Sequence, residues 1–300
     1  MITILLLIQS VWGVEYSRNS SHILIQGVDV SLYRLYAYES TVYQLSEQLL
    51  PQTQEIIEKE PRRIRRQIEL AEGELLCLIP HLVNMTIESE QISDTYLTFN
   101  VKGTLNKEYF VDDLLSLSPE RKKILVGYRK QLNENLRSID NMIKEISSPE
   151  LVDVEQTTDV LLTKLNELNA NHWEFQGQLS ALRRDREAAL EYYNLALGFN
   201  PAMPTVFRRM YEIYEILEDR EKGIEALENL LLIEPTDIDA LYRLGNIAEQ
   251  SGERERAVAY YERLLAVDNN YPEITYYLAA HYFEQDDQEQ ATIYAIQGAQ

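Results

Sequence analysis

Residues 245–268 read GNIAEQSGERERAVAYYERLLAVD, two short amphipathic helical segments on either side of Ser251-Gly252. Small residues stand where an isolated helix pair would carry bulky apolar side chains, at Gly245, Ala248 and Ala257. A glycine inside a helix costs about 1 kcal/mol relative to alanine. We therefore expect these helices to pack so closely against other helices that larger side chains would push them apart.

The same pattern returns at a spacing of 34 residues from Asn171 onward. The aligned columns are Trp173, Phe207, Leu241 and Thr275; Gly177, Tyr211, Gly245 and Ala279; Ala189, Gly223, Ala257 and Ala291; and Tyr193, Leu227, Tyr261 and Ala295. Several columns agree at one fixed spacing, which is typical of a solenoid built from helix pairs.

At these residues the chain resembles the tetratricopeptide repeat family, whose units are helix-turn-helix hairpins of about 34 residues. Three residues depart from the family pattern: Tyr211 in the small column, Thr275 in the large column and Asn269 in place of the loop proline. The resemblance implies four units, at about residues 170–203, 204–237, 238–271 and 272–300. Close packing of stacked units would offset the helix penalty of the small residues.

Residues 28–170 carry long helical patterns without this repeat. Apolar residues recur three or four positions apart from Leu32 to Leu49 and again after Pro61. Ser118-Pro119 predicts the start of a helix that ends before residues 147–149, and a further helix is expected over 152–168. Apolar and polar residues alternate over 95–103, which predicts a strand paired with the segment 22–28.

The chain is therefore expected to be mainly α-helical. Residues 14–168 would form a helical, partly coiled-coil-like domain with a small β element, and residues 169–300 a tetratricopeptide solenoid of about four repeats. Residues 1–13 are expected to be a signal peptide, because an apolar run over 2–8 is too short to span a membrane and precedes small residues. The protein would then be exported, to the periplasm or another extracytoplasmic compartment; the alternative is a cytoplasmic chain.

Composition and motifs argue against several function classes. A formal net charge of -21 disfavours a nucleic-acid binder, which needs a basic face for phosphates. Cys77 is the one cysteine, in an apolar setting, so we expect a buried side chain and no disulfide. The histidines His22, His81, His172 and His281 have no metal-motif spacing, and phosphate-binding and nucleophile motifs are absent. We expect no enzyme activity, no cofactor and no metal.

The resemblance implies a function in protein–protein interaction, as an adaptor or assembly scaffold that binds a peptide or protein segment in the concave groove lined by the first helix of each unit. The groove residues expected to bind are Arg208, Glu212, Tyr242, Asn246 and Tyr276. One alternative is a cytoplasmic repeat adaptor or co-chaperone. A second alternative is an enzyme whose catalytic region lies in the N-terminal half.

Two further expectations concern assembly. Solenoids usually end in a capping helix with a polar outer face, but Ile293 and Ile296 lie near the end of the fourth unit. Either this unit is loosely packed, or its exposed face meets another subunit and forms a homo-oligomer through the C-terminal repeat. Membrane association is expected only through a partner or through an uncleaved N-terminus, because the rest of the sequence holds no apolar run of spanning length.

Overall fold

The computed structural model describes residues 14–26, 28–68, 70–148 and 154–299, which hold thirteen helices and three strands. The expected signal peptide lies outside these residues. The chain divides into two compact units, Met1–Phe175 and Gln176–Gln300. The predicted mainly α fold with a small β element is confirmed. Among the described residues, no helix combines the length and the apolar character that crossing a membrane requires.

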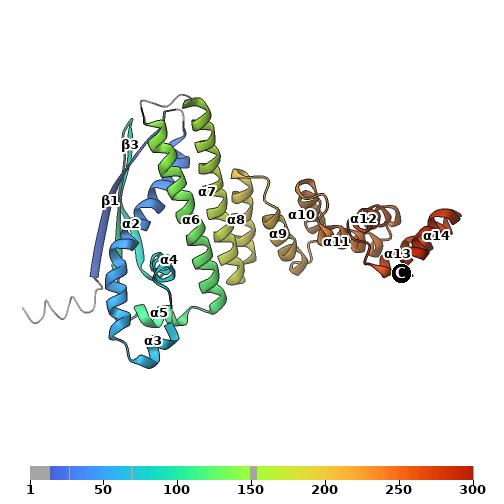
Figure 1. The fold of residues 1–300 in the computed structure, drawn as a ribbon, viewed down its shortest axis with the longest axis horizontal. Coiled ribbons are helices and arrows are strands. Elements are labelled where there is room, and N and C mark those ends of the chain that lie inside the picture. The colour runs from blue at the N-terminus through green and yellow to red at the C-terminus, as the bar shows by residue number, and fades with distance from the viewer. Residues whose placement is uncertain (1–13, 27, 69, 149–153, 300) are drawn as a thin grey trace, which may run out of the picture. The chain divides into compact units, whose positions relative to one another are not determined.

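The first unit places an antiparallel sheet beside helices (Figure 1). Its strands are β1 (Val14–Ile23), β2 (Asn84–Ile92) and β3 (Tyr96–Leu105), in the order β1-β3-β2. The long helix α2 (Val30–Lys59) contacts β1 and β3. Alternate β3 residues from Leu97 to Leu105 are buried, so one face of the sheet forms the core. Gly103 lies on that face and lets the Leu45 side chain of α2 approach the strand closely.

The predicted strand at 95–103 is confirmed as β3, and its predicted partner is right only at its first residues. The segment 22–28 contributes only His22 and Ile23, at the end of β1. The sequence pattern did not reveal the two edge strands, β1 and β2, for a physical reason. β1 is rich in polar residues, and β2 is exposed along nearly its whole length, so neither shows the alternation of a half-buried strand.

The remaining helices of the first unit are α3 (Arg62–Ile68), α4 (Glu72–Leu82), α5 (Phe110–Ser116), α6 (Pro119–Ile146) and α7 (Val154–Leu182), the last of which continues into the second unit. The predicted start of α6 is confirmed, because the Ser118 hydroxyl caps it by accepting from the backbone N–H of Arg121. The helix expected over 152–168 continues to Leu182, through the pair 168/169 where the sequence analysis placed a domain boundary.

The second unit consists of consecutive helical hairpins. After the end of α7 come α8 (Arg186–Phe199), α9 (Pro204–Ile216), α10 (Arg220–Ile233), α11 (Ile238–Gln250), α12 (Arg254–Val267), α13 (Pro272–Glu284) and α14 (Gln288–Gln297). Helices α9 and α10, α11 and α12, and α13 and α14 pair, and each pair contacts the next through α10 with α11 and α12 with α13. The predicted hairpin solenoid of the C-terminal half is thus confirmed.

The hairpin turns share one backbone feature. A residue with positive φ recurs at the same position of each turn: Arg184 at 64°, Glu218 at 58°, Gly252 at 76° and Asp286 at 62°. Glycine adopts this left-handed conformation without the strain that other residues incur, yet only one of these four positions carries glycine. The next residue is an N-cap in each turn, and three of the four are aspartates that accept from the backbone: Asp185, Asp219 and Asp287.

Candidate functional site

The small residues of the repeat accommodate large aromatic rings. A Cβ atom built on Gly245 of α11 would lie 2.6 Å from Cδ1 of Tyr261 on α12, and the same holds for Gly177 and Tyr193. Real Cβ atoms do not come so near another atom, so glycine is required for this packing. The tyrosine rings of both hairpins are buried. The glycines therefore set the distance between the two helices of each hairpin.

The second hairpin carries its tyrosine on the other helix. Tyr211 of α9 occupies the small column, and a Cβ built on Gly223 of α10 would lie 3.6 Å from the Tyr211 ring. This is an ordinary van der Waals distance, so Gly223 leaves room beside Tyr211 but the packing does not require glycine there.

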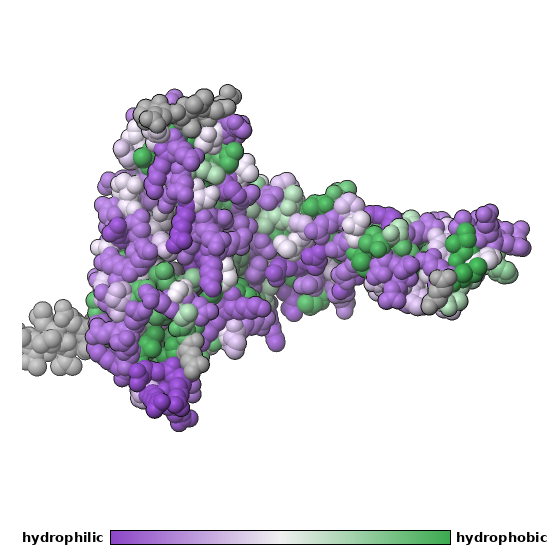
Figure 2. All heavy atoms as spheres, in the orientation of Figure 1, coloured by the Kyte–Doolittle hydropathy of each residue, from purple (hydrophilic) through white to green (hydrophobic). Residues whose placement is uncertain are grey.

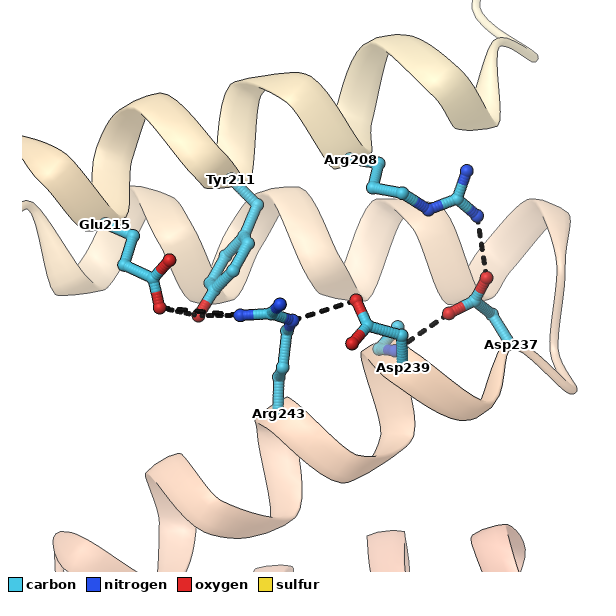
Figure 3. Close-up of polar contacts among 7 residues, drawn as sticks. Arg208, Tyr211, Glu215, Asp237, Asp239 and Arg243 are labelled. Carbon is cyan, nitrogen blue, oxygen red and sulfur yellow. Dashed lines mark hydrogen bonds and ion pairs between the residues drawn. The ribbon is translucent and has the colours of Figure 1, made fainter. Parts of the chain in front are cut away.

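A network of charged and aromatic side chains connects the second hairpin to the third (Figure 3). The guanidinium of Arg208 donates to Oδ2 of Asp237 at 2.7 Å and to Glu234 at 3.3 Å. Asp237 also caps α11, with Oδ1 accepting from the N–H of Ala240 at 2.7 Å. The hydrogen bond to Asp237 raises the pKa of Arg208 above its ordinary value. Arg208 thus joins the second hairpin to the N-terminus of α11 in the third.

Arg243 of α11 forms the other half of this network. It donates to Asp239 at 2.8 Å, to the Tyr211 hydroxyl at 3.3 Å and to Glu215 at 3.4 Å, and its guanidinium lies 5.0 Å from the centroid of the Tyr211 ring. Burial lowers the pKa of Arg243, but its hydrogen bonds to Tyr211 and Asp239 outweigh burial and raise it. The sequence analysis missed Arg243 and Asp237, because the contacts that join them to the second hairpin, with Tyr211, Glu215 and Arg208, span 28 to 32 residues of the chain.

The five predicted groove residues lie on the first helices of three hairpins. They differ in whether their side chains already contact other side chains of the repeat. Arg208 is paired as described, and the Tyr242 ring lies 6.0 Å from that of Tyr271. Asn246 is half-buried, and its Oδ1 lies 2.6 Å from the Tyr261 hydroxyl, which has Glu249 as a second acceptor at 2.7 Å. Glu212 and Tyr276 are exposed. The part of the chain that the structure describes offers no ion pair to Glu212.

The first unit contains a buried polar cluster. Arg129 of α6 donates to Glu39 of α2 at 2.6 Å, and both side chains are only 5% exposed. Tyr128 and His172 share a hydrogen bond of 2.9 Å, and Tyr128 stacks on Phe175 at 3.7 Å. Burial raises the pKa of Tyr128 and lowers that of His172. The paired charges and stacked rings make this cluster part of the helix packing.

The other candidates for chemistry are also packed into the fold. Cys77 is buried as predicted, and burial raises the pKa of its thiol. His22 lies 3.3 Å from the Thr41 hydroxyl, and burial lowers its pKa. Nε2 of His81 is buried and unpartnered. The described residues contain no group of three side chains placed to hold a metal ion.

Comparison with known proteins identifies one repeat of the chain by a family model. Residues 238–271, which contain α11 and α12, match the family model described as a tetratricopeptide repeat, so the predicted resemblance is confirmed at its third unit. A solved structure of MamA is similar at 14% identity and a TM-score of 0.35, covering 61% of this chain and 94% of that chain. A second, MamA AMB-1, has 14% identity and a TM-score of 0.36, covering 56% and 91%. No curated protein sequence matches the chain.

Proposed function

We propose that the protein is a non-enzymatic scaffold that holds a segment of a partner protein in the groove lined by the first helices of its repeat hairpins. The observation that carries the proposal is the set of hairpins itself, which includes a tetratricopeptide repeat at 238–271. Repeat solenoids of this kind present extended concave surfaces suited to protein segments.

The charges of the groove indicate what kind of segment fits. Arg208 of the second hairpin and Arg243 of the third already bond to acidic side chains of the repeat. Glu212 is exposed and free of such a pair in the described structure, so the charge that faces a partner there is negative. We infer that the partner segment presents a Lys or Arg to Glu212, an apolar side chain to Tyr242 and a polar side chain to Asn246.

The test is a cross-linking capture of partners with Glu212→Lys/Asn246→Ala. Neither change should unfold the repeat, because Glu212 is exposed and the Tyr261 hydroxyl keeps Glu249 as its acceptor when Asn246 is removed. Glu191→Lys is the matched control, an exposed charge reversal on the second helix α8. The groove variant should lose partners that the wild type and Glu191→Lys retain. Equal recovery by all three proteins would reject the groove as the binding surface.

We also propose that the scaffold acts outside the cytoplasm. This proposal rests on the apolar run at residues 2–8 alone. Sequencing the amino terminus of the protein purified from its source tests it directly. Loss of the first thirteen or so residues supports export, whereas an intact Met1 favours the cytoplasmic adaptor.

A further inference from the structure

The short helix α3 of the first unit turns a face of arginines outward. These residues, named here the arginine face, are Arg62, Arg63, Arg65 and Arg66. A helix turns through about 100° per residue, so Ile64 and Ile68 lie together on one side of α3 and the arginines cover the opposite side. Ile68 is buried, whereas all four arginines are exposed. Figure 2 shows strongly hydrophilic surface at the end of the first unit where Figure 1 labels α3.

The arginine face is free of partners. Within the part of the chain that the structure describes, none of its four side chains has an ion pair or a hydrogen bond. Arginines elsewhere in the chain do bond to carboxylates, as Arg129 does to Glu39 and Arg208 to Asp237. The first turn of α3 contains no acidic residue. The four guanidinium groups are therefore available to an anion outside the chain.

The arginine face does not help the helix to form. Like charges four residues apart on a helix, such as Arg62 and Arg66, repel each other, and positive charges in the first turn oppose the helix dipole. A helix of seven residues is not stable by itself, so α3 depends on the burial of Ile68 and on its contact with α5. A bound anion would remove the repulsion between the arginines, which the fold itself leaves uncompensated.

The arginine face lies at the end of the first unit where the N-terminal apolar run joins it. Val14, the first residue of β1, pairs with Leu105, the last residue of β3. From Leu105 the chain continues through residues 106–109 into α5, which contacts α3. The apolar run at residues 2–8 ends six residues before Val14, and six residues of chain span at most about 20 Å. An apolar segment and a basic face are thus attached to one end of the unit.

We propose that the arginine face binds the surface of a membrane that contains anionic phospholipids. A guanidinium group binds phosphate oxygens through two parallel hydrogen bonds, and each basic residue near an anionic lipid surface strengthens the attachment. Because Ile64 and Ile68 point toward the protein, α3 would contact the headgroups without entering the acyl chains. This attachment is peripheral and needs no helix that spans the membrane.

Two observations favour a lipid surface over an acidic protein as the occupant. A short apolar segment binds a membrane weakly, and a basic face at the same end of the unit supplies the second contact that stable binding requires. If the segment is removed as a signal peptide, the arginine face stays in place on α3. The net charge of -21 does not prevent binding, because charges more than about 8 Å away are largely screened at physiological salt.

Co-sedimentation of the full chain with lipid vesicles tests the proposal. The wild type should bind vesicles of equal parts phosphatidylcholine and phosphatidylglycerol, should not bind vesicles of phosphatidylcholine alone, and should be released by about 0.5 M salt. Arg62→Glu/Arg66→Glu should lower the partition coefficient onto the anionic vesicles about tenfold or more. Both side chains are exposed and unpaired in the described structure, so the fold is retained, which circular dichroism checks.

Arg183→Glu/Arg184→Glu is the matched control. These two arginines are exposed in the turn between α7 and α8, and Glu218 already occupies the position of Arg184 in the next turn. The control lowers the net charge by the same amount as Arg62→Glu/Arg66→Glu, so it measures the general repulsion between an acidic protein and an anionic surface. It should bind the anionic vesicles as the wild type does.

Three results would overturn the proposal: a wild type that binds neither kind of vesicle, equal binding to both kinds, or equal losses in the variant and the control. A wild type that binds polyglutamate but no vesicle would also overturn it, in favour of an acidic polypeptide as the occupant. Glu212→Lys/Asn246→Ala should still bind the anionic vesicles. The lipid proposal and the groove proposal can therefore fail separately.

Discussion

Gly245 and Tyr261 form a pair in which the absence of one side chain makes room for the other. The tyrosine ring is buried, and it lies where any β-carbon on residue 245 would collide with it. The penalty of a helical glycine is thus offset by the burial of an aromatic ring. The same pairing recurs at Gly177 and Tyr193, so two of the hairpins share this contact.

Gly245→Ala should lower the free energy of unfolding by about 1–3 kcal/mol, because the added methyl group overlaps the Tyr261 ring. Helix propensity alone would predict stabilisation by about 1 kcal/mol, so the sign of the effect decides between the two. Gly198→Ala in α8 is the control, since a Cβ there meets no atom within 4 Å. Urea unfolding should show the control unchanged or stabilised; stabilisation by Gly245→Ala would contradict the packing.

Substitutions at two of the turn residues with positive φ should have opposite effects on the stability of the protein. Glu218→Gly should stabilise the protein by up to about 1 kcal/mol, because glycine relieves the strain at φ 58°. Gly252→Ala should destabilise it by about 1 kcal/mol, because alanine is strained at φ 76° although no atom obstructs its Cβ. Thermal unfolding of both variants measures the effects, and a shift of the same sign in both would show that backbone strain is not the cause.

Asp237 has two separable roles, as the N-cap of α11 and as the partner of Arg208. Asp237→Asn keeps an N-cap side chain and should lose only the ion pair, about 0.5–1 kcal/mol at this partly exposed site. Asp237→Ala should cost about 1 kcal/mol more. In a double-mutant cycle, Arg208→Ala should then cost less on top of Asp237→Asn than it costs alone, because only its longer contact to Glu234 is left to lose. Full additivity of the two changes would mean that the pair contributes nothing.

Acid should destabilise the first unit through its buried histidines. Burial, and then the positive charges of Arg129 and Arg121, lower the pKa of His81 from 6.5 to about 3. The unfolded chain binds a proton below pH 6.5 that the folded chain binds only near pH 3, so stability falls as the pH drops through this window. Between the unfolded and the folded pKa, each pH unit lowers the free energy of unfolding by about 1.4 kcal/mol for one such histidine.

His81→Leu removes this titration and should flatten the dependence of unfolding free energy on pH between 6.5 and about 3. His22 and His172, whose pKa values burial also lowers, account for part of the remaining slope. Chemical denaturation at several pH values measures the slope for both proteins. Parallel profiles would show that His81 is not buried in its neutral form.

Particular residues show how far the sequence predicts this fold. The 34-residue columns predict the hairpins because each column reports a contact inside one repeat, such as Gly245 with Tyr261. Ser118-Pro119 predicts a helix start because capping is local. The edge strands β1 and β2 lack a buried apolar face, so no alternation marks them. Their pairing depends on β3 and α2, which a local pattern cannot report.

The sequence placed the groove residues on the correct helices, but it could not show which of them are already paired within the repeat. Arg208 has the position of a groove residue in the family pattern, but its partners Glu234 and Asp237 lie 26 and 29 residues further along the chain. Periodicity indicates which face a side chain occupies, and it does not indicate whether a neighbouring hairpin already uses its charge. Glu212, whose position the same pattern gives, is exposed and unpaired in the described structure, and it is therefore the better probe of binding.

Partner binding in the groove is tested most directly by a photo-cross-linking amino acid at position 212, compared with the same group at position 191 on α8. Both side chains are exposed on helices of the repeat unit, so they differ chiefly in the helix that carries them. We predict that position 212 forms a covalent adduct with a partner polypeptide, in clearly higher yield than position 191. Adducts of equal yield at both positions, or at position 191 alone, would contradict a partner held along the first helices.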